Sequence, residues 1–208
     1  MPANNAQLEA ISSATVAKDL IKIGVKTTRI HKYIFPRLGI KLLRTIWEEC
    51  HGTRPARGGS VAHLVQHYGR NRLGLIELSQ FSEIYLKTIG GDSLVEKPNS
   101  QIFHKSIMNG QFIRAWQIFE STFSPRQLTS SDAILCARDL CTKGAKLVYC
   151  NGCKRRYIHI NDMEDRGEQI AGLFPDTQEK RVKQHQKCQY CLLHRKASCL
   201  AKDALKND

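Results

Sequence analysis

Apolar residues recur three or four positions apart along the first quarter of the chain, which predicts a series of amphipathic helices. The first helix is expected between residues 6 and 23. Thr27 or Thr28 is expected to cap a short second helix, because a threonine hydroxyl can accept a free N–H of the first turn. A third helix is expected to begin near Pro36 and to end near Cys50. Its predicted inner face carries Leu38, Leu42, Leu43, Ile46 and Trp47.

Three helices within residues 16–51 have the layout of a tri-helical, helix-turn-helix-like DNA-binding unit. Basic side chains spaced by four and then three residues share one face of a helix, which suits contact with phosphates. The alternative is an ordinary three-helix bundle with a solvated basic face. The candidate DNA contacts in this unit are Arg29, Lys32, Arg37, Lys41 and Arg44.

Helical spacing continues through the middle of the chain, residues 61–143. Helices are expected from Val61 to Tyr68 and from Leu75 to Ile89, and one long amphipathic helix from Ile102 to Phe123. Ser130 or Ser131 is expected to cap a further helix that ends near Gly144. The aromatic residues of the long segment are expected to form core. The predicted fold is therefore mainly α, with a helical region over residues 1–143 and a separate C-terminal segment over residues 144–208.

The chain of 208 residues has a formal net charge of +13, and the excess lies at its two ends, residues 1–60 and 144–208. Two basic ends around a nearly balanced middle favour a polyanion at the ends and a protein partner at the middle. Hydrophobic residues make up 41% of the chain, enough for a core, which argues against a disordered basic tail. No apolar run approaches the ~20 residues that span a bilayer, and residues 1–20 lack a secretory-signal pattern. We therefore expect a cytoplasmic, nucleoid-associated protein with reduced or metal-bound cysteines.

Two CxxC pairs near the C-terminus predict a metal site. Cys150 and Cys153 form the first pair, and Cys188 and Cys191 form the second after a 34-residue spacer. Two such knuckles can supply four thiolates to one tetrahedral Zn²⁺. Residues 146–149 and 156–160 have strand composition, which predicts a zinc-ribbon-like hairpin with the first knuckle at its tip.

Other interpretations of these cysteines are free thiols, a redox pair, or a site in which His159, His185 or His194 replaces one thiolate. A redox pair of the thioredoxin type would need a βαβ context, which is absent. Cys50, Cys136, Cys141 and Cys199 lack knuckle spacing, and the first three are expected to be small buried side chains of helices. Further candidate DNA contacts follow the first knuckle directly: Lys154, Arg155 and Arg156.

Nothing in the sequence favours catalysis. A four-thiolate site has no open coordination position, so the zinc is expected to be structural. The motifs of serine hydrolases, zinc proteases, P-loop enzymes and zinc deaminases are not present in the sequence. We therefore expect a protein that is not an enzyme.

The order of these features resembles the FlhC-type subunits of the bacterial flagellar master transcriptional activator. The resemblance is carried by AKDLIKIG, by IKLLRTIWEECHGTRPARG, and by CARDLCTKGAKLVYCNGCKRRYIHI leading into the paired knuckles. It implies a mostly helical subunit with a four-cysteine zinc site, a small helical FlhD-like partner, double-stranded promoter DNA and RNA polymerase. The inter-knuckle segment is longer than in the family, and RGGSVAHLVQHYGRNRLGLIEL departs from its usual pattern. Relatives on conjugative elements activate transfer genes, so the resemblance is compatible with flagellar or conjugative targets.

A second hypothesis is a zinc-ribbon module that binds nucleic acid or protein without promoter specificity. It would bind unrelated duplexes or RNA equally well. A third hypothesis, a metalloenzyme, would require an open zinc site.

Overall fold

The computed structural model describes residues 3–55, 72–95, 99–124, 126–160 and 188–193, and these residues are mainly helical. The expected helix at Val61–Tyr68 lies outside them. The elements in chain order are α1 (Ala3–Lys22), α2 (Thr27–Tyr33), α3 (Ile40–His51), α5 (Arg72–Ile89), the 3₁₀ turn η1 (Asp92–Val95), α6 (Ser100–Met108), α7 (Gln111–Thr122), α8 (Ser130–Thr142), β1 (Ala145–Tyr149) and β2 (Arg156–Ile160).

The N-terminal unit has the three expected helices, but their ends differ from the prediction. Lys26, rather than a threonine, occupies the cap position of α2, and its backbone N–H donates to the Ser131 hydroxyl at 2.8 Å. The cap is therefore supplied by α8, 105 residues further along the chain. The third helix begins at Ile40, so the residues from Pro36 to Gly39 belong to the preceding turn. It ends at Gly52, whose φ of 66° lies in the left-handed region that glycine adopts without strain.

The predicted inner face of α3 is correct except at one position. Leu43 and Ile46 are buried, whereas Leu42 is 46% exposed. Leu42 lies 100° round the helix from Leu43 on the ideal helical wheel, at the border of the packed face. Helical spacing alone does not resolve such border positions.

The long segment expected from Ile102 to Phe123 is two helices, α6 and α7. Gly110, with φ 70°, makes the turn between them. The apolar pattern continues across the break because both helices bury one face in the same core, so the pattern could not reveal the turn.

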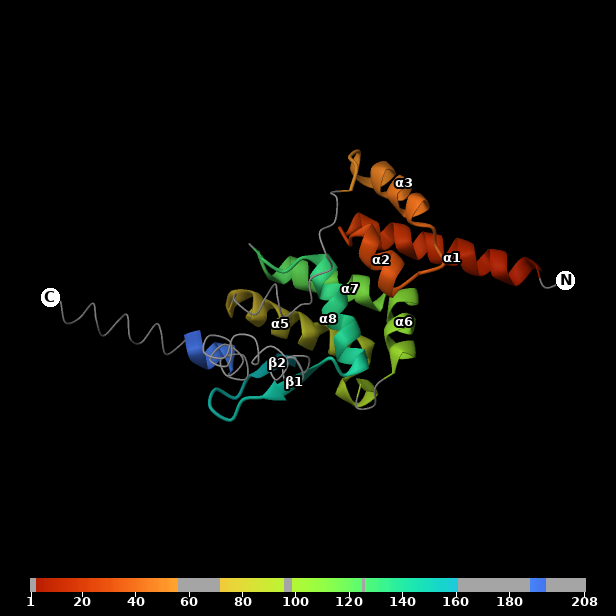
Figure 1. The fold of residues 1–208 in the computed structure, drawn as a ribbon. Helices are drawn as coiled ribbons and strands as arrows, with labels where there is room; N and C mark the ends of the chain where they lie inside the picture. Colours follow the sequence, from red (N-terminus) through yellow and green to blue (C-terminus); the bar gives the residue numbers. More distant parts are fainter. Residues whose placement is uncertain (1–2, 56–71, 96–98, 125, 161–187, 194–208) are drawn as a thin grey trace, which may run out of the picture.

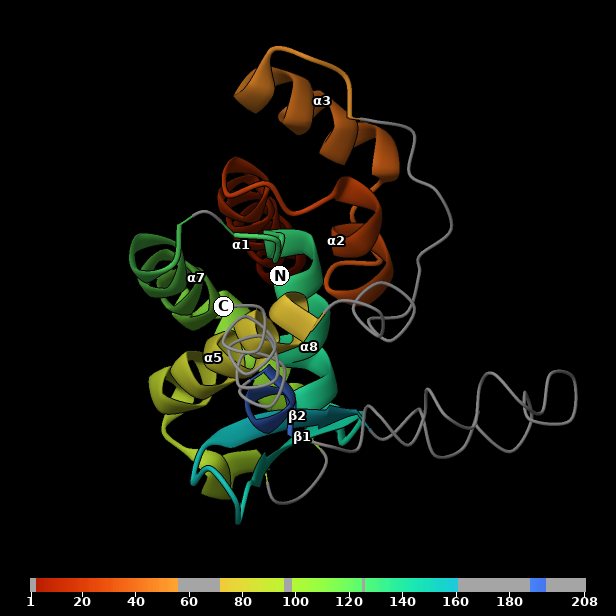
Figure 2. The ribbon, with the colours of Figure 1, turned by 90° about the vertical axis from the view of Figure 1, so that its left-hand side faces the viewer.

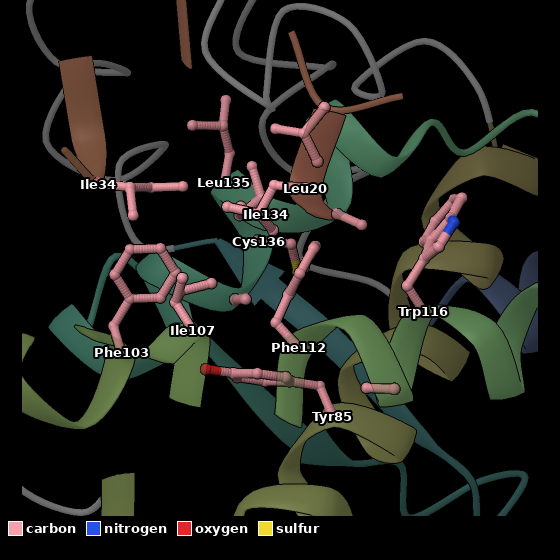
Figure 3. Close-up of a cluster of buried hydrophobic side chains, with 14 of the residues drawn as sticks. Leu20, Ile34, Tyr85, Phe103, Ile107, Phe112, Trp116, Ile134, Leu135 and Cys136 are labelled. Carbon is pink, nitrogen blue, oxygen red and sulfur yellow. The ribbon is translucent and has the colours of Figure 1, made fainter. Parts of the chain in front are cut away.

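The core is one cluster of buried side chains drawn from both ends of the chain. It contains Ala17 and Leu20 of α1 as well as Ile158 and Ile160 of β2. Aromatic side chains such as Tyr85, Phe112 and Trp116 pack among aliphatic ones in this cluster (Figure 3). The Phe81 ring lies 5.9 Å from the rings of both Phe112 and Phe119. The aromatic residues of the middle region are thus core, as predicted.

β1 and β2 form the expected antiparallel hairpin, with Ala145 opposite Ile160 and Tyr149 opposite Arg156. The hairpin packs against α5, and the Ile158 N–H donates to the Ser79 hydroxyl of α5 at 2.9 Å. A helical side chain therefore satisfies a backbone group at the edge of the short sheet.

The arrangement places the N-terminal unit and the hairpin far apart. In Figures 1 and 2, which are turned by 90° about the vertical axis, α3 lies at the top and the β1–β2 hairpin at the bottom. Helices α5 to α8 fill the space between them. Within the described ranges, no helix is long and apolar enough to cross a membrane.

Candidate metal centre and basic surfaces

The first knuckle is a tight turn between the two strands. The Cys150 N–H donates to the Arg155 carbonyl, and the Lys154 N–H donates to the Cys150 carbonyl, both at 2.9 Å. Lys154 adopts φ 57° and is the left-handed residue of the turn. These bonds close the tip of the hairpin and hold Cys150 and Cys153 in one turn.

The second knuckle is a helical turn over residues 188–193, in which the Leu192 N–H donates to the Cys188 carbonyl. It brings its sulfurs against those of the first knuckle. The Sγ atoms of Cys150 and Cys191 are 3.6 Å apart, and those of Cys153 and Cys188 are 3.5 Å apart.

All four Sγ atoms lie within 4.8 Å of one another. Sulfurs bound at 2.3 Å around one tetrahedral ion would be about 3.8 Å apart, so the observed spacing fits a four-thiolate metal site. The four cysteines that the spacing predicted therefore form one cluster that can hold a metal ion.

The cluster cysteines differ in their electrostatic surroundings. Burial raises the pKa of Cys188 to about 12, whereas backbone N–H groups of Cys153 and Gly152 lower the pKa of Cys150 to about 6. A divalent cation would favour the thiolate form at every position, because the metal ligand is the deprotonated sulfur.

The cysteines without knuckle spacing have other roles. Cys136 and Cys141 are fully buried in α8, and burial raises the pKa of both thiols, that of Cys136 to about 12. They are inert core residues, as predicted. Cys50 is partly buried against the core, and Cys199 lies outside the described residues.

Two basic residues have exposed side chains at the tip of the hairpin. Lys154 and Arg155 are exposed, and the Arg155 guanidinium lies 5.1 Å from the centre of the Tyr190 ring. Tyr190 is buried between the two cysteines of the second knuckle, so the cluster that can bind metal also positions Arg155. Arg156 is half-buried and pairs with Asp92, which compensates its charge.

Four of the five candidate contacts in the N-terminal unit are exposed: Lys32, Arg37, Lys41 and Arg44. Lys41 and Arg44 lie on the first turns of α3, while Arg37 lies in the turn before it and so does not share their helix. Among the described residues, these four and the hairpin pair Lys154 and Arg155 form no ion pair, unlike exposed lysines such as Lys22 and Lys87.

Arg29 is a correction to the predicted set. Its side chain is 10% exposed and points inward, where its Nη2 donates to the Asp132 carboxylate of α8 at 2.9 Å. The helical pattern placed Arg29 on a polar face, but that face packs against α8. Arg29 is a structural residue and is not available on the surface.

Two supporting residues, Asp132 and Tyr190, were missed at the sequence level. No local sequence pattern pointed to the role of Asp132, because its partner Arg29 is 103 residues away. For Tyr190 the pattern was weak: it is an aromatic residue between the two cysteines of the second knuckle.

Comparison with known proteins adds no family to this description. The chain matches no protein-family model, and no curated protein matches it.

Proposed function

We propose that the protein is the DNA-binding subunit of a heteromeric transcriptional activator of the FlhD/FlhC kind, with one structural Zn²⁺ held by Cys150, Cys153, Cys188 and Cys191. The observation that carries the proposal is the presence of six exposed cations on α2–α3 and the hairpin tip that pair with no acidic residue in the part of the chain that the structure describes. Cations without acidic partners attract phosphates and release counterions when they bind.

The zinc would have a structural role in this protein. It would bind the second knuckle to the hairpin and so maintain the contact between the Arg155 guanidinium and the Tyr190 ring at the tip. With four thiolates the ion has no open position for substrate or water, which favours a binding protein over an enzyme.

The partners follow from the same proposal. The duplex is promoter DNA of conjugative-transfer or flagellar genes in the bacterial cytoplasm. A small helical FlhD-like subunit would complete the activator, which would recruit RNA polymerase. The middle of the chain, whose charges are nearly balanced, is the part that we assign to the partner subunit.

A second candidate is a zinc-ribbon module that binds nucleic acid without promoter specificity. It is favoured by the same cations, because phosphate contacts alone carry no sequence information.

Footprinting with the zinc-loaded protein and its co-expressed partner tests the proposal. The probe is a duplex selected from a random-sequence library, compared with unrelated duplexes and RNA of equal length. We expect protection of the selected duplex and a steep loss of affinity with salt. Equal binding to all probes would favour the second candidate, and no protection at low salt would refute both.

Charge-neutralised variants test the assigned surface. Lys41→Gln with Arg44→Gln should reduce the slope of log affinity against log salt by about two, one unit for each lost phosphate contact. Lys22→Gln with Lys87→Gln is the matched control, because it removes the same net charge from exposed lysines that are already paired. An equal effect of both double variants would mean that only net charge matters.

A further inference from the structure

The two halves of α3 differ in charge and in pairing. The first half carries Lys41 and Arg44, which form no ion pair among the described residues. In the second half, Glu48 pairs with Arg54 and Glu49 with Lys18. A polyanion that approaches α3 therefore meets unpaired positive charge on the first half, whereas the charges of the second half are paired.

The basic half of α3 also carries an exposed apolar side chain. Leu42 is 46% exposed, although its neighbours Leu43 and Ile46 are buried. Thr45, three residues on, is also exposed, and its hydroxyl donates to the Lys41 carbonyl of its own helix. The basic half of α3 thus presents Leu42 and Thr45 beside two cations.

The position of α3 leaves this half accessible. The helix packs chiefly against α1 and α2, and Figures 1 and 2 place it at the outer end of the molecule. Its 12 residues span about 18 Å, and the major groove of B-DNA, about 12 Å wide, admits an α-helix. In helix-turn-helix proteins, the first residues of the recognition helix meet the base edges.

We propose that the first half of α3 enters the major groove and that Leu42 contacts the C5-methyl group of a thymine, which makes Leu42 a residue that determines sequence specificity. Thymine is the base that offers an apolar group in this groove, and apolar side chains recognise it there. Lys41 and Arg44 hold the helix against the flanking phosphates. The inference rests on the proposed DNA-binding function and adds the base that this surface reads.

Replacement of thymine by deoxyuridine tests the contact, because deoxyuridine lacks only the methyl group. The selected duplex is synthesised with each thymine replaced in turn, and the affinity of the zinc-loaded complex is measured for each. We expect one position in each site at which the wild type binds about four-fold more weakly, the equivalent of one buried methyl group.

The variant Leu42→Ala should remove that sensitivity. It should bind the thymine and deoxyuridine duplexes equally at this position, while it keeps the salt dependence of the wild type. Ile118→Ala is the matched control, because Ile118 is 42% exposed but belongs to α7, an element that carries none of the six candidate contacts. This control should retain the four-fold difference.

Three outcomes would overturn the inference. They are a wild type with no position sensitive to deoxyuridine, a Leu42→Ala variant that keeps the difference, and a Leu42→Ala variant that loses only its affinity for the partner subunit. In each case specific protection of the selected duplex would still stand, so failure of the thymine contact is distinguishable from failure of the proposed function.

Discussion

Arg29 and Asp132 form an ion pair in which both side chains are almost completely buried. Their side chains are 10% and 7% exposed, and Asp132 also accepts a hydrogen bond from the Thr129 hydroxyl at 2.7 Å. Charges in such surroundings are tolerated only as a pair, because neither retains enough water to be stable alone. Arg29 therefore stabilises the contact between α2 and α8.

Arg29→Met should destabilise the protein by about 3 kcal/mol, because it leaves the Asp132 carboxylate buried without a cation. Urea unfolding measures the change, and Arg29→Met with Asp132→Leu should recover most of the loss. If the single variant kept full stability and lost DNA affinity instead, Arg29 would be a DNA contact, as its position in the sequence suggested.

The sequence identified the four cysteines correctly and misplaced Arg29 for one physical reason. Metal ligands in a knuckle are close in sequence, so their spacing reports their geometry directly. The environment of Arg29 is set by a partner 103 residues away, and a local pattern contains no information on such a contact.

At the level of elements, the contact between α5 and β2 shows how a two-stranded sheet is kept stable. Such a sheet is marginal on its own and has two open edges. Ser79, which is buried, provides an acceptor for the Ile158 N–H, and Ile158 itself enters the core. The hairpin that carries the first knuckle is therefore anchored by the helical core.

Ser79→Ala should cost about 1–3 kcal/mol, because the buried Ile158 N–H would lose its acceptor. The exchange of this amide with deuterium should accelerate while that of α8 amides changes little. Ser121→Ala serves as control, because Ser121 is exposed and bonds only within its own helix. Unchanged protection at Ile158 would show that water replaces the serine.

Elements bounded by strong local signals were predicted well. Both strands and the ends of α1, α3 and α5 agree with their apolar patterns and glycines to within a few residues. The single helix expected over α6 and α7 was wrong, because both helices bury one face in the same core. The expected caps were wrong as well: Lys26 precedes α2, and Thr129, rather than Ser130 or Ser131, caps α8.

At the scale of the molecule, the four-cysteine cluster and the core support different parts of the chain. The contacts of the second knuckle include its sulfurs and the Tyr190 ring, whereas β2 is held by Ile158 and Ile160 in the common core. Loss of the metal should therefore release the second knuckle more readily than the helices.

Cys153→Ser or Cys188→Ser should abolish stoichiometric zinc and unfold the segment that the knuckles organise, within the C-terminal third of the chain. Metal analysis and limited proteolysis with mass spectrometry measure the two effects, and Cys50→Ser, outside the cluster, is the control. Full zinc content and native proteolysis in both variants would mean that the site is elsewhere.

The hydrogen bonds from α8 to the N-terminal helices also determine how this protein can be dissected. The Ser131 hydroxyl donates to the Gly24 carbonyl and accepts from the Lys26 N–H, and Asp132 holds Arg29. A fragment that ends before α8 would remove the hydrogen-bond partner of Gly24 and Lys26 and leave Arg29 without its carboxylate. Truncation would thus confuse loss of folding with loss of binding, and single substitutions on the intact chain are the sounder route to separating its surfaces.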